Sequence, residues 1–101
     1  MTTYYVSGPM SGLPESNYPA FNHAAARLRA MGYSVENPAE CYWQPTWLAY
    51  MRIAVAKLAR CDAIVMLPGW EASRGAKVEH ALAVLHDLPV HFLDELLEVA
   101  A

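Results

Sequence analysis

The chain has 101 residues, enough for one domain and too few for two. Its hydrophobic share of 55% exceeds the usual share of roughly 45–50%, and its charged share of 17% is below the usual value of about 25%. We therefore expect surplus apolar surface that further copies of the chain cover in a homo-oligomer. A net charge of −3 argues against a broad nucleic-acid-binding face, and no apolar run approaches the roughly 18 residues of a membrane span.

The first half of the chain alternates between short strands and a helix. Residues 3–7 are rich in β-forming side chains and predict the first strand. A helix is expected to begin at Asn17 and to end at Gly32, which suits a left-handed cap. Residues 34–36 predict a second, shorter strand. The helix carries apolar side chains on one face at helical spacing, namely Phe21, Ala24, Ala25, Leu28 and Met31.

The second half of the chain repeats this alternation. We expect helices over residues 47–60 and 74–86, strands over residues 63–67 and 90–93, and a terminal helix over residues 94–99. The core-facing side chains expected on the two long helices are Leu48, Met51, Val55 and Leu58 on the first, and Val78, Ala81, Leu82 and Leu85 on the second.

This element order predicts a single α/β domain over residues 1–101. Alternating strands and helices favour a parallel sheet with right-handed crossovers. We expect a three-layer sandwich with about four strands in the order 2-1-3-4, so that the topological switch point lies between the first and third strands. The glycine-containing loops 8–12 and 68–73 then meet at one crevice, which predicts a ligand site. Trp43 and Trp47 flank the start of the second helix and suit a lid, a subunit contact or the core.

The start of helix 74–86 is the best candidate for chemistry. Ser73 is expected to cap the helix, and its hydroxyl can also bind a phosphate or hydroxyl of a ligand together with the first helical N–H groups. Gly75 and Ala76 are small, so a ligand could lie against that turn. Trp70 either stacks on a base or covers the end of the sheet.

Glu79 lies about 9 Å along the helix from Ser73. Two interpretations stay open: an exposed helical Glu, or a nucleophile or general base whose ionised form the helix N-terminus favours. A carboxylate can attack an anomeric carbon and form a glycosyl-enzyme ester. Glu71 is the better second carboxylate, because Asp62 begins its strand at the opposite edge of the sheet and is interpreted as structural.

The sequence offers little sign of a metal site or of export. Cys41 and Cys61 have no metal-binding spacing and indicate no disulfide framework, and the four histidines form no convincing metal set. The N-terminus lacks a basic region and a long apolar stretch, so we expect no signal peptide. The expectation is a cytoplasmic protein that uses no metal or other cofactor and contacts neither a nucleic-acid polymer nor a membrane.

Four segments, at residues 5–10, 37–40, 47–52 and 67–79, resemble the DUF4406 family of small bacterial and phage proteins. The most specific of them is the run Leu-Pro-Gly-Trp-Glu-x-Ser-x-Gly-Ala-x-x-Glu, which ends at Glu79. This family is similar to the nucleoside 2-deoxyribosyltransferases and the 2′-deoxynucleoside 5′-monophosphate N-hydrolases. The resemblance implies a flavodoxin-like fold and a dimer or larger assembly with sites near the interface.

The resemblance also implies roles for individual residues. Glu79 matches the nucleophile that attacks C1′ of a deoxyribose, and Ser73 matches the position that binds the 5′ end. The substrate-binding set expected at the pocket is Tyr5, Gly8, Pro9, Met10, Gly69, Trp70, Glu71, Ser73, Gly75 and Ala76. Pro9 stands where the hydrolases carry a hydroxyl side chain, so a phosphate there would meet backbone groups.

One departure from the pattern is Ala54, which stands where the relatives place an Asp that helps to protonate the leaving base. Such a proton donor is typically worth about 10²–10⁴ in rate. The sequence therefore supports two main hypotheses: an N-glycosidic hydrolase or deoxyribosyl transferase that acts on deoxynucleosides or their monophosphates, and a nucleotide-binding sensor module that lacks the acid. A structural accessory subunit of a phage is a weaker third hypothesis.

Overall fold

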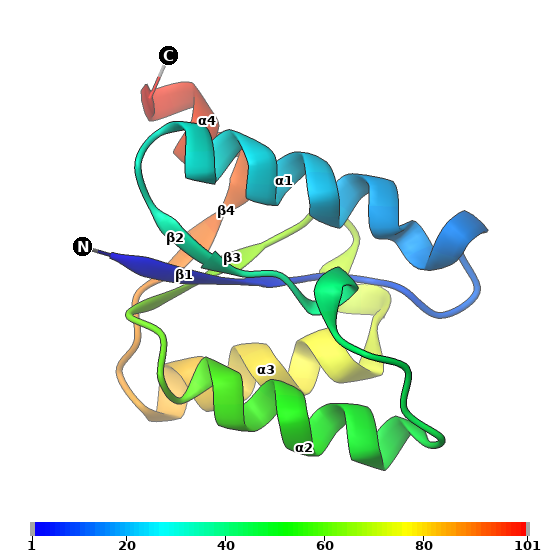
Figure 1. Ribbon diagram of the computed structural model, residues 1–101. Helices are drawn as coiled ribbons and strands as arrows, with labels where there is room; N and C mark the ends of the chain where they lie inside the picture. The colour runs from blue at the N-terminus through cyan, green and yellow to red at the C-terminus, as the bar shows by residue number, and fades with distance from the viewer. Residues whose placement is uncertain (1, 101) are drawn as a thin grey trace.

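The computed structural model describes residues 2–100 and forms a three-layer α/β sandwich (Figure 1). The middle layer is a parallel sheet with the strand order β2-β1-β3-β4, as predicted. Its strands are β1 (Thr3–Ser7), β2 (Ser34–Glu36), β3 (Ala63–Met66) and β4 (Val90–Phe92). This topology is that of a flavodoxin-like fold.

Two helices cover each face of the sheet (Figure 1). The first pair is α1 (Tyr18–Ala30) and α4 (Leu93–Ala100), and the second pair is α2 (Trp47–Leu58) and α3 (Arg74–Leu85). The expected helices are confirmed to within a few residues at their ends. The sequence did not predict the short 3₁₀ helices η1 (Pro14–Asn17), η2 (Pro38–Glu40) and η3 (Trp70–Ala72). No helix within the described part of the chain combines the length and the apolar character that crossing a membrane requires.

The central strand β1 divides the core between the two faces. Tyr4 and Val6 join the cluster beneath α1 and α4. Tyr5 and Ser7 alternate to the other face, where Tyr5 joins the cluster beneath α2 and α3. Because β1 pairs with β2 on one side and β3 on the other, its side chains are held at fixed positions. The sheet therefore presents a phenol and a serine hydroxyl to the helices α2 and α3.

Helix α1 packs as its sequence predicts. Phe21, Ala24, Ala25 and Leu28 are all buried. The helix ends at Ala30, and Gly32 follows with a φ of +94°, the left-handed conformation that the cap requires. The N–H of Tyr33 then donates to the carbonyl oxygen of Leu28 at 3.2 Å and closes the cap.

The predicted buried face of α3 is largely wrong, and that of α2 is only partly buried, with Met51 and Val55 half-buried. On α3 the buried residues are Ala76, Glu79 and Ala83, whereas Val78, Ala81 and Leu85 are exposed, with Leu85 exposed to 76%. On α2 only Leu58 of the predicted set is fully buried, and Leu48 is exposed. Both helices carry apolar residues on several sides, so hydrophobic periodicity does not select one face. Small residues let α3 approach the sheet closely. Val78, Val84 and Leu85 are exposed, while Leu82 is half-buried against the core.

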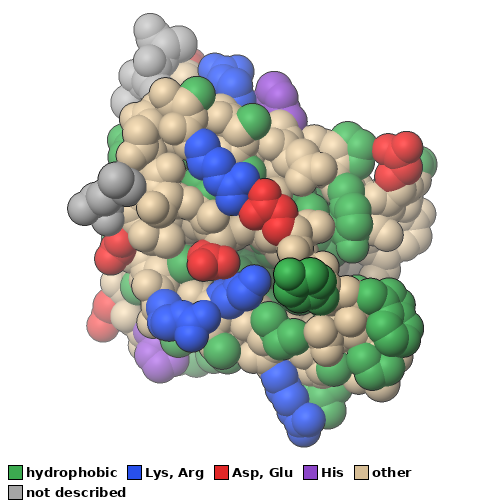
Figure 2. All heavy atoms as spheres, viewed as in Figure 1, with side chains coloured by type: hydrophobic (Ala, Val, Ile, Leu, Met, Phe, Trp, Pro, Cys, Tyr) green, Lys and Arg blue, Asp and Glu red, His purple; other side chains and the backbone are tan. Residues whose placement is uncertain are grey.

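Part of the apolar surplus lies on the surface between η2 and α2. Tyr42 is 88% exposed and Trp43 is 78% exposed, so Trp43 does not belong to the core. Figure 2 shows hydrophobic side chains gathered on the side of the molecule where Figure 1 places this segment. The exposed apolar surface that composition predicted is present, and its coverage by a second copy of the chain stays a prediction.

Candidate functional site

The two glycine-containing loops meet at the carboxyl edge of the sheet. A Cβ atom on Gly69, whose φ is +85°, would lie 3.5 Å from Cγ of Pro9. A Cβ atom on Gly8 would lie only 2.7 Å from Cβ of Leu67. The side-chain amide of Asn17 donates to the carbonyl oxygen of Pro9 at 2.8 Å and ties this loop to the start of α1. The meeting of the loops that follow β1 and β3 is therefore as the strand order predicted.

Helix α3 begins beside these loops. The Ser73 hydroxyl accepts from the N–H of Ala76 at 3.2 Å and caps the helix, as predicted. Gly75 and Ala76, the small residues in the first turn of α3, do not leave the free space that the sequence suggested. A Cβ atom on Gly75 would lie 3.3 Å from Sδ of Met51, and Ala76 is buried in the core. The small size of Gly75 and Ala76 therefore allows α2 and the sheet to approach α3, and their part in binding a ligand stays a prediction.

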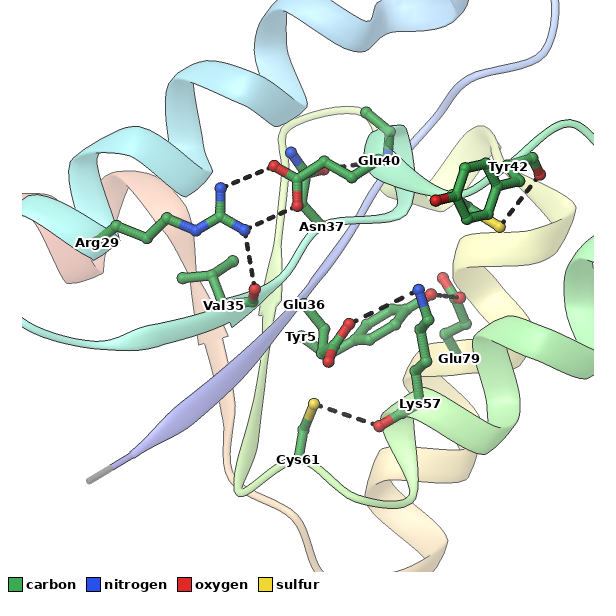
Figure 3. A network of polar contacts seen from close by, with 12 residues as sticks. Tyr5, Arg29, Val35, Glu36, Asn37, Glu40, Tyr42, Lys57, Cys61 and Glu79 are labelled. Carbon is green, nitrogen blue, oxygen red and sulfur yellow. Dashed lines mark hydrogen bonds and ion pairs between the residues drawn. The ribbon is translucent and has the colours of Figure 1, made fainter.

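Glu79 is the polar centre of this region. Only 6% of the residue is exposed, which rules out an exposed helical Glu. The Tyr5 hydroxyl donates to Oε2 of Glu79 at 2.5 Å (Figure 3), and the Ser7 hydroxyl donates to Oε1 at 2.7 Å. Both donors come from β1, so one strand and one helix build the whole contact.

Ser7 is the residue of this site that the sequence analysis did not single out. A signal was available, because side chains two residues apart on a strand share a face. Tyr5 was a candidate, and Ser7 follows it on that same face with a hydroxyl in a strand that is otherwise buried and apolar.

Burial and hydrogen bonding act in opposite directions on Glu79. Burial raises the pKa of its carboxyl above the ordinary value of 4.5, and the hydrogen bonds from Tyr5 and Ser7 lower it by less. Burial and the neighbouring Glu79 charge raise the pKa of Tyr5 well above 10.0, so its hydroxyl stays protonated and serves as a donor. The pKa of Glu79 is therefore raised overall, although the helix N-terminus was expected to favour the ionised carboxyl.

This balance makes a testable prediction about stability. Between the ordinary and the raised pKa the folded chain holds a proton on Glu79 that the unfolded chain has lost, so the free energy of unfolding falls as pH rises. The contribution of Glu79 is fully present below the unfolded pKa of 4.5 and is lost as pH rises through the folded value. Glu79→Gln has no such proton, so we expect its stability relative to the parent to increase from about pH 4 to pH 8.

Urea unfolding of the two chains across this pH range measures the difference directly. The other titrating groups are common to both chains and cancel in the comparison. A difference that stays flat with pH, or that shifts in favour of the parent as pH rises, would contradict the raised pKa of Glu79.

The remaining aromatic candidates stack on charged or polar partners. The ring of Trp70 stacks on that of His80, with 4.4 Å between the centroids and 23° between the planes. The guanidinium of Arg74 lies 3.9 Å above the ring of Trp47. These contacts tie η3 to α3 and the start of α2 to the start of α3. Trp70 is therefore held by the protein itself on one face.

The other predicted residues lie in surroundings of their own. Glu71 is exposed on η3, and Met10 packs against the cluster beneath α1 and α4. Asp62 accepts from the N–H of Thr3 at 2.8 Å at the amino edge of the sheet, which confirms its structural interpretation. Among the described residues there is no group of three His, Cys, Asp or Glu side chains that could hold a metal ion.

Cys61 is buried beneath α2 and α3. Burial is the main cause that raises the pKa of its thiol to about 11, so it stays protonated at neutral pH and is a poor nucleophile. Its Sγ donates to the Lys57 carbonyl oxygen at 3.3 Å (Figure 3). Cys61 therefore belongs to the packing of this face and not to its chemistry.

Ala54 on α2 lies on the same side of the sheet as Glu79. It is half-buried and packs against the cluster that contains Tyr5 and Ala76. A longer side chain at this position would therefore extend along that cluster.

Two surface grooves of the described structure lie elsewhere. One runs between β4 and α4 and includes His91 and Glu95. The other lies between the C-terminal ends of α2 and α3 and includes Leu58 and His86, at the opposite edge of the sheet from Ser73. Neither groove has Glu79 among its lining residues.

Comparison with known proteins identifies the family of the chain. No curated protein matches the sequence. The family whose sequence pattern fits the chain is described as a domain of unknown function, and the match extends from residue 2 to residue 92. It includes β1, with Tyr5 and Ser7, and all of α3, with Glu79. The chain therefore belongs to the DUF4406 family.

Proposed function

We propose that this protein cleaves the N-glycosidic bond of deoxynucleosides or deoxynucleoside monophosphates, with Glu79 as the nucleophile at C1′. The observation that carries the proposal is the buried Glu79 carboxyl with one hydroxyl donor on each oxygen. It lies on a helix whose N-terminus is at the carboxyl edge of a parallel sheet, where such folds bind ligands. The similarity of the DUF4406 pattern to deoxyribosyltransferases and nucleotide N-hydrolases adds support.

The chemistry would take two steps. An oxygen of Glu79 forms a bond to C1′ while the bond from C1′ to the base nitrogen breaks, and the base leaves with that electron pair and takes up a proton. Water, or a second base in a transferase, then attacks C1′ and releases the Glu79 carboxylate. Forming the ester removes the negative charge from a carboxylate that burial already disfavours. The same burial lowers the fraction of Glu79 that is ionised, so the rate is expected to rise with pH through its raised pKa.

The position of the substrate follows from the helix. Ser73 and the first N–H groups of α3 lie at the sheet edge, and Glu79 is about 9 Å further along the helix. A 5′ hydroxyl or phosphate bound at Ser73 would bring a sugar toward the carboxyl. Arg74 adds positive charge at this end of the helix, which favours a phosphate.

A second function is favoured by Ala54, which leaves the site without the acid that the similar enzymes carry. A chain that binds a nucleotide at this site without a proton donor would not cleave it. The low exposure of Glu79 agrees with such a binding module, since the reacting carbon must contact a carboxylate oxygen for cleavage. Both functions predict the same ligand, but only the first predicts release of the free base.

The test is an assay of base release from the four common deoxynucleosides and their 5′-monophosphates, with free base measured by chromatography. Glu79→Gln is the matched control, because it keeps the size of the side chain and removes the nucleophile. We expect release by the parent and none by the variant. Release that survives Glu79→Gln would remove Glu79 from the mechanism, and binding without release by the parent would support the binding module.

A further inference from the structure

The backbone of Ser7 is held firmly by the neighbouring strand β3. The residue is fully buried, and it pairs in register with Met66. The carbonyl oxygen of Ser7 accepts from the N–H of Leu67 at 2.8 Å, and the following Gly8 packs directly against the Leu67 side chain. The Ser7 backbone is therefore fixed by β3, and its hydroxyl has only the few staggered positions of χ1.

Glu79 has more freedom than its donor. A Glu side chain has three rotatable bonds, and the last of them has a broad, roughly two-fold energy profile. Tyr5 alone would hold Oε2 and leave the carboxyl free to turn about that contact. The Ser7 hydroxyl at 2.7 Å from Oε1 adds a second fixed point, so the plane of the carboxyl is defined.

We propose that Ser7 is a positioning residue that fixes the orientation of the Glu79 carboxyl by its hydrogen bond to Oε1. The proposal rests on the proposed N-glycosidic activity for its consequence, because a nucleophile must present one lone pair along the line of attack. Each carboxylate oxygen has two lone pairs, so the oxygen that receives a hydroxyl keeps one for C1′. Misplacement by about 1 Å can cost on the order of 10² in rate.

The same hydrogen bond acts on the charge of Glu79. A hydroxyl that donates to the ionised carboxyl favours that form, and the negative charge returns to Glu79 when the glycosyl ester breaks down. Among the described residues, the titratable group in contact with the carboxyl is Tyr5, and Cys61 and Cys41 lie close enough to affect the pKa of that tyrosine. Since Tyr5 stays protonated, a change in the titration of Glu79 on substitution of Ser7 reports the lost donor.

The test combines two variants with a readout that does not need activity. Ser7→Ala removes the donor, and Ser7→Cys keeps nearly the same shape with only a weak donor. The Glu79 carboxyl is titrated by carbon-13 NMR of glutamate-labelled protein, with its resonance identified by its absence in Glu79→Gln. We expect both variants to titrate at higher pH than the parent, and kcat for base release to fall by about 10² with little change in KM. Ser7→Thr, which retains the hydroxyl, should restore both values.

The outcomes separate this inference from the proposed function. An unchanged Glu79 titration in both Ser7→Ala and Ser7→Cys would overturn the positioning role, even if the parent releases base. A raised titration in a protein that releases no base would support the hydrogen-bonding role of Ser7 and reject the proposed activity. Circular dichroism confirms that each variant is folded, and Ser7→Cys serves if Ser7→Ala is not.

Discussion

Introducing an acid at position 54 is expected to raise base release by about 10²–10⁴-fold. The departing base leaves with the electron pair of the glycosidic bond, so a group that supplies a proton lowers the barrier. Ala54 packs against the cluster of Tyr5 and Ala76, on the face of the sheet that carries Glu79. Ala54→Asp therefore places a carboxyl on the face of the sheet that carries the proposed reaction centre.

The surroundings of position 54 suit a general acid. The position is half-buried against apolar side chains, and partial burial raises the pKa of a carboxyl. The neighbouring Glu79 charge acts in the same direction, so the new carboxyl would retain its proton closer to neutral pH. Two carboxyls with different surroundings and different roles are a common arrangement in glycosidic enzymes.

The measurement is the rate of base release by Ala54→Asp and by Ala54→Asn, which has the same shape and no acidic proton. We expect the increase only for Asp, and we expect Glu79→Gln to abolish it in the double variant. Equal rates for Asp and Asn would show that position 54 does not reach the leaving base. If the parent binds nucleotide without cleaving it and Ala54→Asp releases base, the missing acid is what separates the binding module from an enzyme.

The architecture was predictable because it depends on patterns that local sequence controls. β1 and β2 were predicted with the observed bounds, and the strand order followed from alternating strands and helices with right-handed crossovers. Helix α1 has a single apolar stripe, so its buried face was also correct. The same strand order correctly placed the loops around Pro9 and Gly69 together.

The orientation of α3 was not predictable from its own residues. Its apolar side chains surround most of the helix, and the prediction placed Val78 and Leu85, which the structure exposes, in the core. The structure buries Ala76 and Ala83 instead, together with Glu79. That choice depends on hydroxyl partners for the carboxyl on β1, which lie more than 70 residues away in sequence. Long-range polar pairing of this kind has no signature in the periodicity of one helix.

Contacts between side chains were the other part that the sequence did not specify. Trp70 was considered as a stacking surface for a base, and the structure places His80 against it. Gly75 was considered as room for a ligand, and the structure places Met51 of α2 there. In both cases the residue type correctly indicated the kind of contact, a stacked ring or a close approach. Which group makes that contact depended on how neighbouring elements pack.

Substituting Gly8 by Ala is expected to lower the free energy of unfolding by about 1–3 kcal/mol. A Cβ atom at this position would lie 2.7 Å from Cβ and 3.0 Å from Cδ1 of Leu67. The Leu67 side chain can rotate its outer atoms away, but its Cβ is fixed to the backbone that follows β3. The end of β1 must therefore shift.

That shift would also move the site, because Gly8 directly follows Ser7. The Ser7 hydroxyl would change its distance from Oε1 of Glu79, which is 2.7 Å in the parent. We expect Gly8→Ala to lose both stability in urea unfolding and base release. Gly32→Ala is the matched control: its φ of +94° also strains a Cβ, but nothing lies within 4 Å of it and it is remote from Glu79. Gly32→Ala should lose about 1 kcal/mol of unfolding free energy and keep the rate of the parent. If Gly8→Ala is as stable as the parent, that result contradicts the close approach of β1 and β3 at this edge.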